Sequence, residues 1–121
     1  NTACFILILM EAAAIKRIGF VLKVKNSMVE EYKHHHRHIW PEMLNALYRH
    51  DWHNYSLFIR EDWLLFRYFE TTQDLQSALK GIQSEEVNRR WQEMMAPFFE
   101  IPPESRPDQM LVELDEIAHL D

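Results

Sequence analysis

Two alternating stretches joined by a very short link constrain this fold more than any other feature of the sequence. Residues 55–60 and 63–70 are rich in aromatic and aliphatic side chains, and only Glu61 and Asp62 lie between them. Alternation with a period of two predicts strands, and strands joined by so tight a turn pair as an antiparallel hairpin. We therefore expect a sheet that is at least partly antiparallel.

One further strand is predicted on each side of this hairpin in the chain. Residues 17–25 and residues 109–115 both alternate between apolar and polar side chains. The side chains expected on one face are Ile18, Phe20, Leu22 and Val24 in the first strand, and Met110, Val112 and Leu114 in the last.

Between the first strand and the hairpin, apolar residues follow a helical spacing over residues 28–47. Ser27 and Glu30 have the spacing of a capping box, which predicts the start of this helix. Pro41 lacks the amide hydrogen that a continuous helix requires. We expect a kink or break between Trp40 and Pro41, with Pro41 in the first turn of a second helical segment.

The segment after the hairpin predicts one or two further helices. Thr71 and Thr72 are the expected cap, and Gly81 is the expected end of the first helix. Helical spacing resumes over residues 84–97 and stops at a proline. Residues 101–107 are rich in proline and predict an exposed connection.

The order of these elements is strand, helix, two strands, helices, strand. It is the order of the split βαβ arrangement of ferredoxin-like domains, an α+β fold with helices on one face of an antiparallel sheet. Both faces of the strand at residues 63–70 carry aromatic or apolar side chains. We expect the face without helices to pair with a second copy of the chain, giving a homodimer of the dimeric α/β-barrel type.

Length and composition favour one domain over residues 10–121. The chain has 121 residues, of which 47% are hydrophobic, so a single core is expected without disulfides or metals. The apolar run that ends at Met10 is too short to span a membrane and has no basic residue before it. We expect Met10 to be the natural start and residues 1–9 to be a non-native or disordered extension.

Net charge limits the classes of partner that are expected, and cysteine content limits the expected cellular location. The formal net charge is −6, with acidic and basic residues interleaved, which argues against nucleic acid and anionic membranes as partners. Cys4 is the only cysteine, so no disulfide within the chain is expected. A reducing cytoplasm is the location that fits best.

The most chemically specific stretch is residues 31–42, which contain a tyrosine, four histidines, a tryptophan, a proline and two glutamates. Tyr32, His36 and Trp40 are four residues apart, so a helix would stack them on one face. Histidine exchanges protons near neutral pH, with an ordinary pKa of about 6.5. A proton-transfer group between aromatic rings with polar tips suits a polar, uncharged ligand such as a sugar.

The neighbouring histidines raise the alternative of a metal site. His34 and His38 are four residues apart and could hold one ion from a helix. A third ligand at a recognisable spacing is missing, so we expect no native metal site. Trp40 and Glu42 are expected to be structural.

Several of these residues together resemble the signature of the L-rhamnose mutarotase family. They are Glu31-Tyr32, His36, Ile39-Trp40-Pro41-Glu42, His53-Asn54-Tyr55-Ser56, Leu65-Phe66 and Arg90-Trp91 with Met95. The resemblance covers residues 17–115. It implies a dimeric α+β barrel that interconverts the α and β anomers of L-rhamnose or a related 6-deoxy sugar without a cofactor.

The resemblance also implies roles for individual residues. The proton-donating histidine of the family corresponds to His36, its sugar-binding tyrosines to Tyr32 and Tyr55, and an aromatic sugar contact to Trp91. Some members have a second tryptophan after that contact, where this chain has Gln92. We expect Gln92 to bond a sugar hydroxyl, and for Trp91 a pure packing role is the alternative.

Two other functions remain open at this level. A non-catalytic sugar-binding module would use His36 only as a hydrogen-bonding group. A different small enzyme on the same fold, such as an oxygenase or decarboxylase, would act on an apolar ring.

Overall fold

The structure is a computed structural model that describes residues 14–121. The expected extension over residues 1–9 and the expected start at Met10 lie outside the described residues. The elements in chain order are β1 (Lys16–Lys23), η1 (Asn26–Met28), α2 (Val29–Arg37), α3 (Pro41–Arg49), β2 (His53–Ile59), β3 (Leu64–Thr71), α4 (Leu75–Gln83), α5 (Glu86–Met95), η2 (Ala96–Phe98), η3 (Pro107–Gln109) and β4 (Val112–Leu114).

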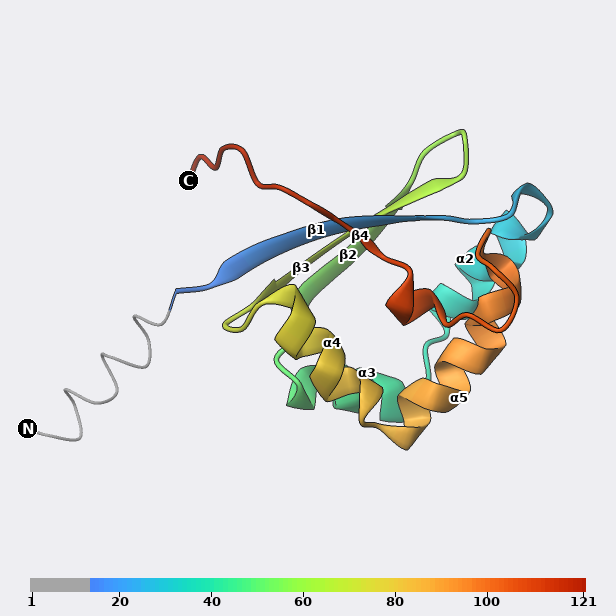
Figure 1. Cartoon of the computed structure of the whole chain (residues 1–121), viewed down its shortest axis with the longest axis horizontal. Coiled ribbons are helices and arrows are strands. Elements are labelled where there is room, and N and C mark those ends of the chain that lie inside the picture. The colour runs from blue at the N-terminus through green and yellow to red at the C-terminus, as the bar shows by residue number, and fades with distance from the viewer. Residues whose placement is uncertain (1–13) are drawn as a thin grey trace, which may run out of the picture.

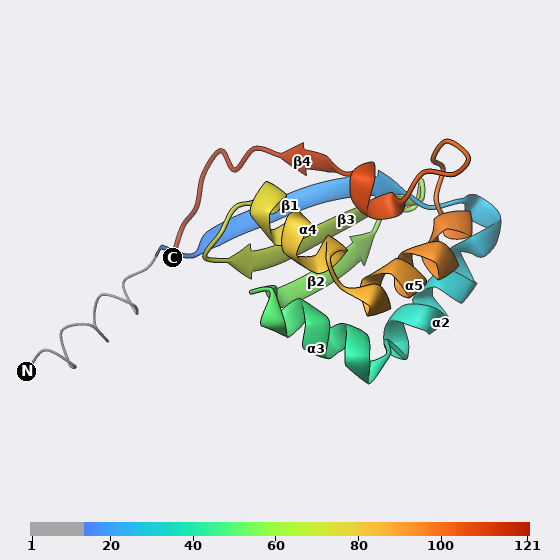
Figure 2. The ribbon, with the colours of Figure 1, turned by 60° about the horizontal axis from the view of Figure 1, so that its bottom comes forward.

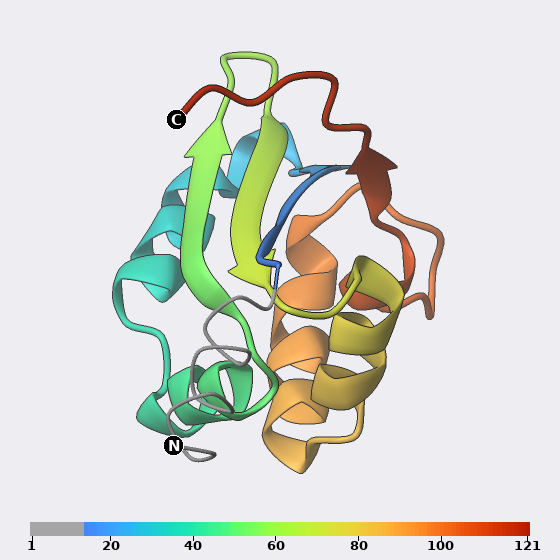
Figure 3. The ribbon, with the colours of Figure 1, turned by 90° about the vertical axis from the view of Figure 1, so that its left-hand side faces the viewer.

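The four strands form one sheet in the order β2-β3-β1-β4, and every neighbouring pair is antiparallel. The helices all lie on one side of this sheet (Figures 1 and 2). Strands β2 and β3 lie side by side as the predicted hairpin (Figure 3). The predicted α+β class, with an antiparallel sheet covered by helices on one face, is confirmed.

The helix-facing side of β1 supplies the centre of the core. Ile18, Phe20, Leu22 and Val24 are all buried, as the alternation of their sequence predicts. Phe20 and Val24 have no exposed surface at all, and Phe20 packs edge-on against Phe69 of β3 at 6.0 Å between ring centroids.

The helical region after β1 breaks where proline predicts. Pro41 is the first residue of α3, and Trp40 before it has an extended backbone with ψ of 135°. The capping box at Ser27, however, is wrong. Ser27 lies inside η1 and caps nothing, because the chain already turns helically over Asn26–Met28 before α2 begins.

The predicted boundaries of α4 are also wrong. Thr71 ends β3, and Thr72 donates both its amide and its hydroxyl to the Asp51 carboxylate. The cap is Asp74, which accepts a hydrogen bond of 2.7 Å from the Ser77 amide. Gly81 lies within α4 instead of ending it.

Gly81 is required for close packing. A Cβ atom at this position would lie 2.6 Å from Nδ1 of His50 and 3.4 Å from its Cβ. In an ordinary helix, changing glycine to alanine stabilises by about 0.5–1 kcal/mol. We expect Gly81→Ala to destabilise the protein by about 1 kcal/mol or more in urea unfolding, because the new methyl group overpacks against His50.

A double substitution provides the control for that prediction. In a His50→Ala background the obstacle is gone, so Gly81→Ala should become neutral or stabilising. Destabilisation of the same size in both backgrounds would contradict the packing argument.

The last strand is shorter than predicted. Only Val112–Leu114 pair with β1, and the end of the proline-rich connection is buried, with Pro107 and Asp108 inside η3. None of the helices in residues 14–121 has both the length and the apolar character to cross a membrane.

Candidate active site

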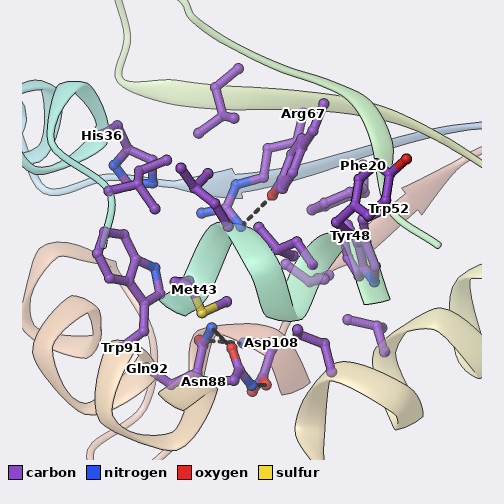
Figure 4. Close-up of a pocket in the computed structure, with 18 residues that line it drawn as sticks. Phe20, His36, Met43, Tyr48, Trp52, Arg67, Asn88, Trp91, Gln92 and Asp108 are labelled. Carbon is purple, nitrogen blue, oxygen red and sulfur yellow. Dashed lines mark hydrogen bonds between the residues drawn. The ribbon is translucent and has the colours of Figure 1, made fainter. Parts of the chain in front are cut away.

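A cavity of about 350 Å³ lies between the sheet and helices α3 and α5. Most of its wall is apolar or aromatic, as in typical small-molecule sites. The polar side chains that line it are His36, Tyr48, Tyr55, Arg67, Asn88, Gln92 and Asp108. Figure 4 shows His36 and Trp91 at one end, Tyr48 and Trp52 at the other, and Arg67 reaching in from the sheet.

His36 stands at the end of α2, held by its own helix. Its Nδ1 lies 3.0 Å from the carbonyl oxygen of Tyr32. A carbonyl can only accept, so Nδ1 must carry the hydrogen, and the Nε2 lone pair of the neutral ring is left free. Burial lowers the pKa of His36 to about 4, and the charge of Arg67 acts in the same direction. The ring is therefore a neutral proton acceptor at neutral pH.

Arg67 links the two predicted tyrosines. It lies on the helix-facing side of β3, where its Nη1 donates to the Tyr55 hydroxyl at 3.3 Å and its Nη2 to the Tyr32 hydroxyl at 3.0 Å. Tyr55 lines the cavity, but Tyr32 does not. Tyr32 is 3% exposed and lies behind the wall, with its ring against that of His36 at 4.1 Å between centroids. Burial raises the pKa of Tyr32 to about 12, so its hydroxyl stays protonated.

Trp91 both packs and faces the cavity. Its ring meets His36 edge-on at 5.6 Å and Trp40 edge-on at 5.1 Å. Trp40 packs against the core next to the cavity, and Glu42 pairs with Arg90 at 3.1 Å on the surface. Neither Trp40 nor Glu42 lines the cavity, and the structural roles expected for them stay predictions.

Gln92 belongs to a hydrogen-bonded network opposite Arg67. Its Nε2 donates to Asn88 at 3.0 Å, and its Oε1 accepts from the amide of Asp108 at 3.2 Å. The Asp108 carboxylate in turn accepts from Asn88 at 3.1 Å and pairs with Arg106 at 3.0 Å. Gln92 thus lines the cavity, and both ends of its amide already bond to protein.

Tyr48, Arg67, Asn88 and Asp108 are polar cavity residues that sequence reasoning missed. The face of β3 that carries Leu65 and Phe69 was expected to be apolar, yet Arg67 lies between them on that face. A charged residue at a core position of a strand was the signal available in the sequence. Asp108 had no comparable signal, because it follows a stretch predicted to be exposed.

The histidines that neighbour His36 in the sequence do not line the cavity. His34 and His38 are exposed and lie against each other at 4.6 Å between ring centroids. Within residues 14–121, no group of three or more histidine, cysteine, aspartate or glutamate side chains is placed to hold a metal ion.

Comparison with known proteins shows which family the chain resembles. The sequence model of the L-rhamnose mutarotase family matches residues 17–120. An L-rhamnose mutarotase of Bacillus subtilis is 34% identical over 108 residues, which cover 88% of this chain and 100% of the relative. One of Klebsiella pneumoniae is 32% identical over 105 residues, which cover 86% of this chain and 97% of the relative.

A solved structure agrees with the sequence comparisons. The crystal structure of an L-rhamnose mutarotase from Formosa agariphila superimposes with a TM-score of 0.69 and 26% sequence identity. The match covers 88% of this chain and 99% of that one. The chain therefore belongs to the L-rhamnose mutarotase family.

Proposed function

We propose that this protein interconverts the α and β anomers of L-rhamnose or a related 6-deoxy sugar. The observation that carries the proposal is His36, a neutral imidazole whose tautomer is set by the Tyr32 carbonyl and which lines a cavity. Opening a pyranose ring requires only that one proton leave the anomeric hydroxyl and one reach the ring oxygen. That chemistry calls for a group that accepts and returns a proton and for no cofactor.

In the proposed reaction, His36 first accepts a proton from the sugar and then returns one to it. Nε2 takes the proton of the anomeric hydroxyl as the bond between C1 and the ring oxygen breaks. The imidazolium then gives a proton to the ring oxygen, which leaves an open-chain aldehyde and a neutral histidine. Rotation about C1–C2 and the reverse steps close the other anomer, and protons balance over the cycle.

The other site residues would bind and orient the sugar. The Tyr55 hydroxyl accepts from Arg67 and keeps its own hydrogen to donate to the sugar. Trp91 offers an apolar ring to the C–H face of the sugar. Gln92 retains one amide hydrogen for a hydroxyl group. We assign Tyr32 a positioning role, because it supports His36 and Arg67 from behind the cavity wall.

Saturation-transfer NMR on the anomeric protons tests this proposal. L-rhamnose, L-fucose and D-glucose at equilibrium are each measured with and without the protein. We expect faster exchange with at least one 6-deoxy sugar. Exchange at the buffer rate for all three sugars would overturn the proposal for 6-deoxy sugars and favour a sugar-binding module, which titration with the same sugars would detect.

The low pKa of His36 predicts the pH dependence of the reaction. Protonation removes the lone pair that accepts the proton, so activity is lost as the pH falls through the pKa of the folded protein. We expect kcat/KM to stay level from about pH 5.5 to about pH 8 and to fall about tenfold per pH unit below about pH 4. Exchange rates corrected for the spontaneous reaction, with circular dichroism to show folding, would measure this. A midpoint near 6.5, the ordinary pKa of histidine, would contradict it.

We propose that the protein is a homodimer that pairs through the helix-free face of its sheet, in the cytoplasm. Apolar side chains are exposed on that face, with Phe58 at 61%, Phe66 at 38% and Val112 at 59%. Their contiguity supports a buried interface. The single cysteine supports a reducing compartment.

Light scattering after size exclusion tests the dimer. We expect the wild type to elute at twice the mass of the chain and Phe66→Glu to elute as a monomer, because a carboxylate would be buried without a partner. Leu44→Glu is the matched control, since Leu44 is 49% exposed on α3, and it should remain a dimer. A monomeric wild type would contradict the proposal.

A further inference from the structure

Arg67 places a positive charge in the cavity wall that no carboxylate within residues 14–121 contacts. In the part of the chain that the structure describes, its hydrogen-bond partners are the hydroxyls of Tyr55 and Tyr32. A guanidinium does not lose its proton in proteins. A cation in largely apolar surroundings is costly unless an opposite charge compensates it.

The other ionisable groups of the cavity leave that charge uncompensated. Asp108 lines the cavity too, but its carboxylate is 6% exposed and already paired with Arg106 at 3.0 Å. His36 is neutral and adds no charge. The cavity wall therefore carries one excess positive charge, which lies at Arg67.

The Arg67 guanidinium is held in place by its neighbours and still has hydrogens to donate to a ligand. The rings of Phe20 and Phe99 lie 5.7 Å and 5.5 Å from its central carbon, and two tyrosine hydroxyls hold its terminal nitrogens. Each terminal nitrogen keeps a second hydrogen. Nε is buried and has no partner within residues 14–121, so the terminal nitrogens are the donors that a ligand can meet. Arg67 is only partly buried and lines the cavity, so a ligand can reach it. Two parallel donors of this kind match the two oxygens of a carboxylate.

The position of Arg67 relative to His36 indicates which part of a sugar it would meet. Tyr32 joins the two, with its ring against His36 and its hydroxyl on Arg67. In a hexopyranose, C1 and C5 flank the ring oxygen, so the C6 group on C5 lies next to the reacting atoms. We therefore expect a ring with its anomeric end at His36 to place its C6 group toward Arg67.

We propose that Arg67 determines specificity and that the site, beyond the 6-deoxy sugars of the proposed function, takes a hexuronic acid in preference, whose C6 carboxylate pairs with this guanidinium. The inference rests on the proposed mutarotase function and concerns the substrate class of the same site. A 6-deoxy sugar has a methyl group at C6, which would leave the charge unbalanced. A phosphate ester carries a charge of nearly −2 at neutral pH, which one guanidinium does not match.

The test compares C6 carboxylates with C6 methyl groups by anomeric exchange NMR. The panel contains D-galacturonate, D-glucuronate, L-guluronate and L-iduronate, with D-fucose, L-fucose, L-rhamnose and glucose 6-phosphate. We expect at least one hexuronate to exceed every neutral sugar in kcat/KM by about tenfold or more. Arg67→Met should lower that value about 100-fold, the order expected when one partner of a charge pair is removed. It should lower neutral-sugar values by a clearly smaller factor, because those sugars lose only the support that Arg67 gives to the Tyr55 and Tyr32 hydroxyls. Arg67→Lys, which keeps the charge, should retain part of the preference.

The failure of this inference can be told apart from the failure of the proposed function. Acceleration of neutral sugars with no preference for any hexuronate would overturn the inference alone. No acceleration of any sugar would overturn both. Equal losses for charged and neutral sugars in Arg67→Met would make Arg67 a mere support for the two tyrosines and would also overturn the inference.

A binding measurement tests the carboxylate pairing separately from activity and also shows whether each variant is folded. Galacturonate and the other hexuronates are added to each protein during thermal unfolding. The best hexuronate should raise the Tm of the wild type and leave that of folded Arg67→Met unchanged. An equal rise for both proteins would contradict the carboxylate pairing.

Discussion

The His36→Ala variant is expected to lose mutarotase activity by about 10²–10⁴-fold, the range that a positioned acid-base group contributes. Alanine removes the Nε2 lone pair, and the other ionisable groups in the cavity wall do not replace it. Arg67 holds its protons. The Asp108 carboxylate is 6% exposed, with Oδ2 bonded to Arg106 and Asn88 and Oδ1 buried. Saturation-transfer NMR on the sugar that the wild type accelerates most would measure the loss.

His38→Ala is the matched control for this prediction. His38 lies at the end of the same helix, and its Nδ1 bonds to the carbonyl oxygen of His34 at 2.9 Å, as that of His36 bonds to Tyr32 at 3.0 Å. His38 is exposed and does not line the cavity. Its removal should leave the rate within about twofold of the wild type. Equal losses in both variants would show that His36 acts through the helix and not through proton transfer.

Phe69→Ala is expected to destabilise the protein by about 3–5 kcal/mol, the cost of emptying a buried aromatic site. Phe69 has no exposed surface, and its ring stacks on that of Trp52 at 3.8 Å between centroids with 13° between the planes. The Trp52 ring lines the cavity, and its Nε1 donates to the Ala78 carbonyl at 3.2 Å. A cavity behind Trp52 would therefore loosen the site as well as the core.

Urea unfolding followed by tryptophan fluorescence would measure this change in the free energy of unfolding. A loss of this size is a large part of the 5–15 kcal/mol that typically stabilises a domain. Phe69→Leu keeps most of the apolar volume and should lose clearly less than Phe69→Ala. Similar losses for both substitutions would place the stability in the aromatic stack and not in the filled volume.

Much of the fold follows from patterns that are local in the chain. The alternation of Ile18, Phe20, Leu22 and Val24 predicts a strand with one buried face, and all four are buried. Pro41 predicts the break between two helices, because it lacks an amide hydrogen whatever surrounds it. Helix ends were less predictable, since a cap depends on where the backbone first turns. Ser27 and Gly81 show this, the first inside a 3-10 turn and the second inside α4.

Part of the candidate site was also predictable from the sequence. His36, Tyr55, Trp91 and Gln92 all line one cavity, although they come from α2, β2 and α5. Tyr32 lies behind the wall, because its place on the helix face nearest the sheet buries it beneath His36 and Arg67. Whether these residues act as proposed stays a prediction.

The sequence by itself determined the strands, the break at Pro41 and the shared helix face of Tyr32 and His36, because each depends on backbone geometry within a few residues. The tertiary structure alone decided that Arg67 meets Tyr32, 35 residues away, and Tyr55, 12 residues away. It also decided that Gln92 is bonded to Asp108 and that burial makes His36 a neutral base. Contacts, burial and pKa values of this kind depend on strand register and on how the helices pack onto the sheet, and these are properties of the whole folded chain.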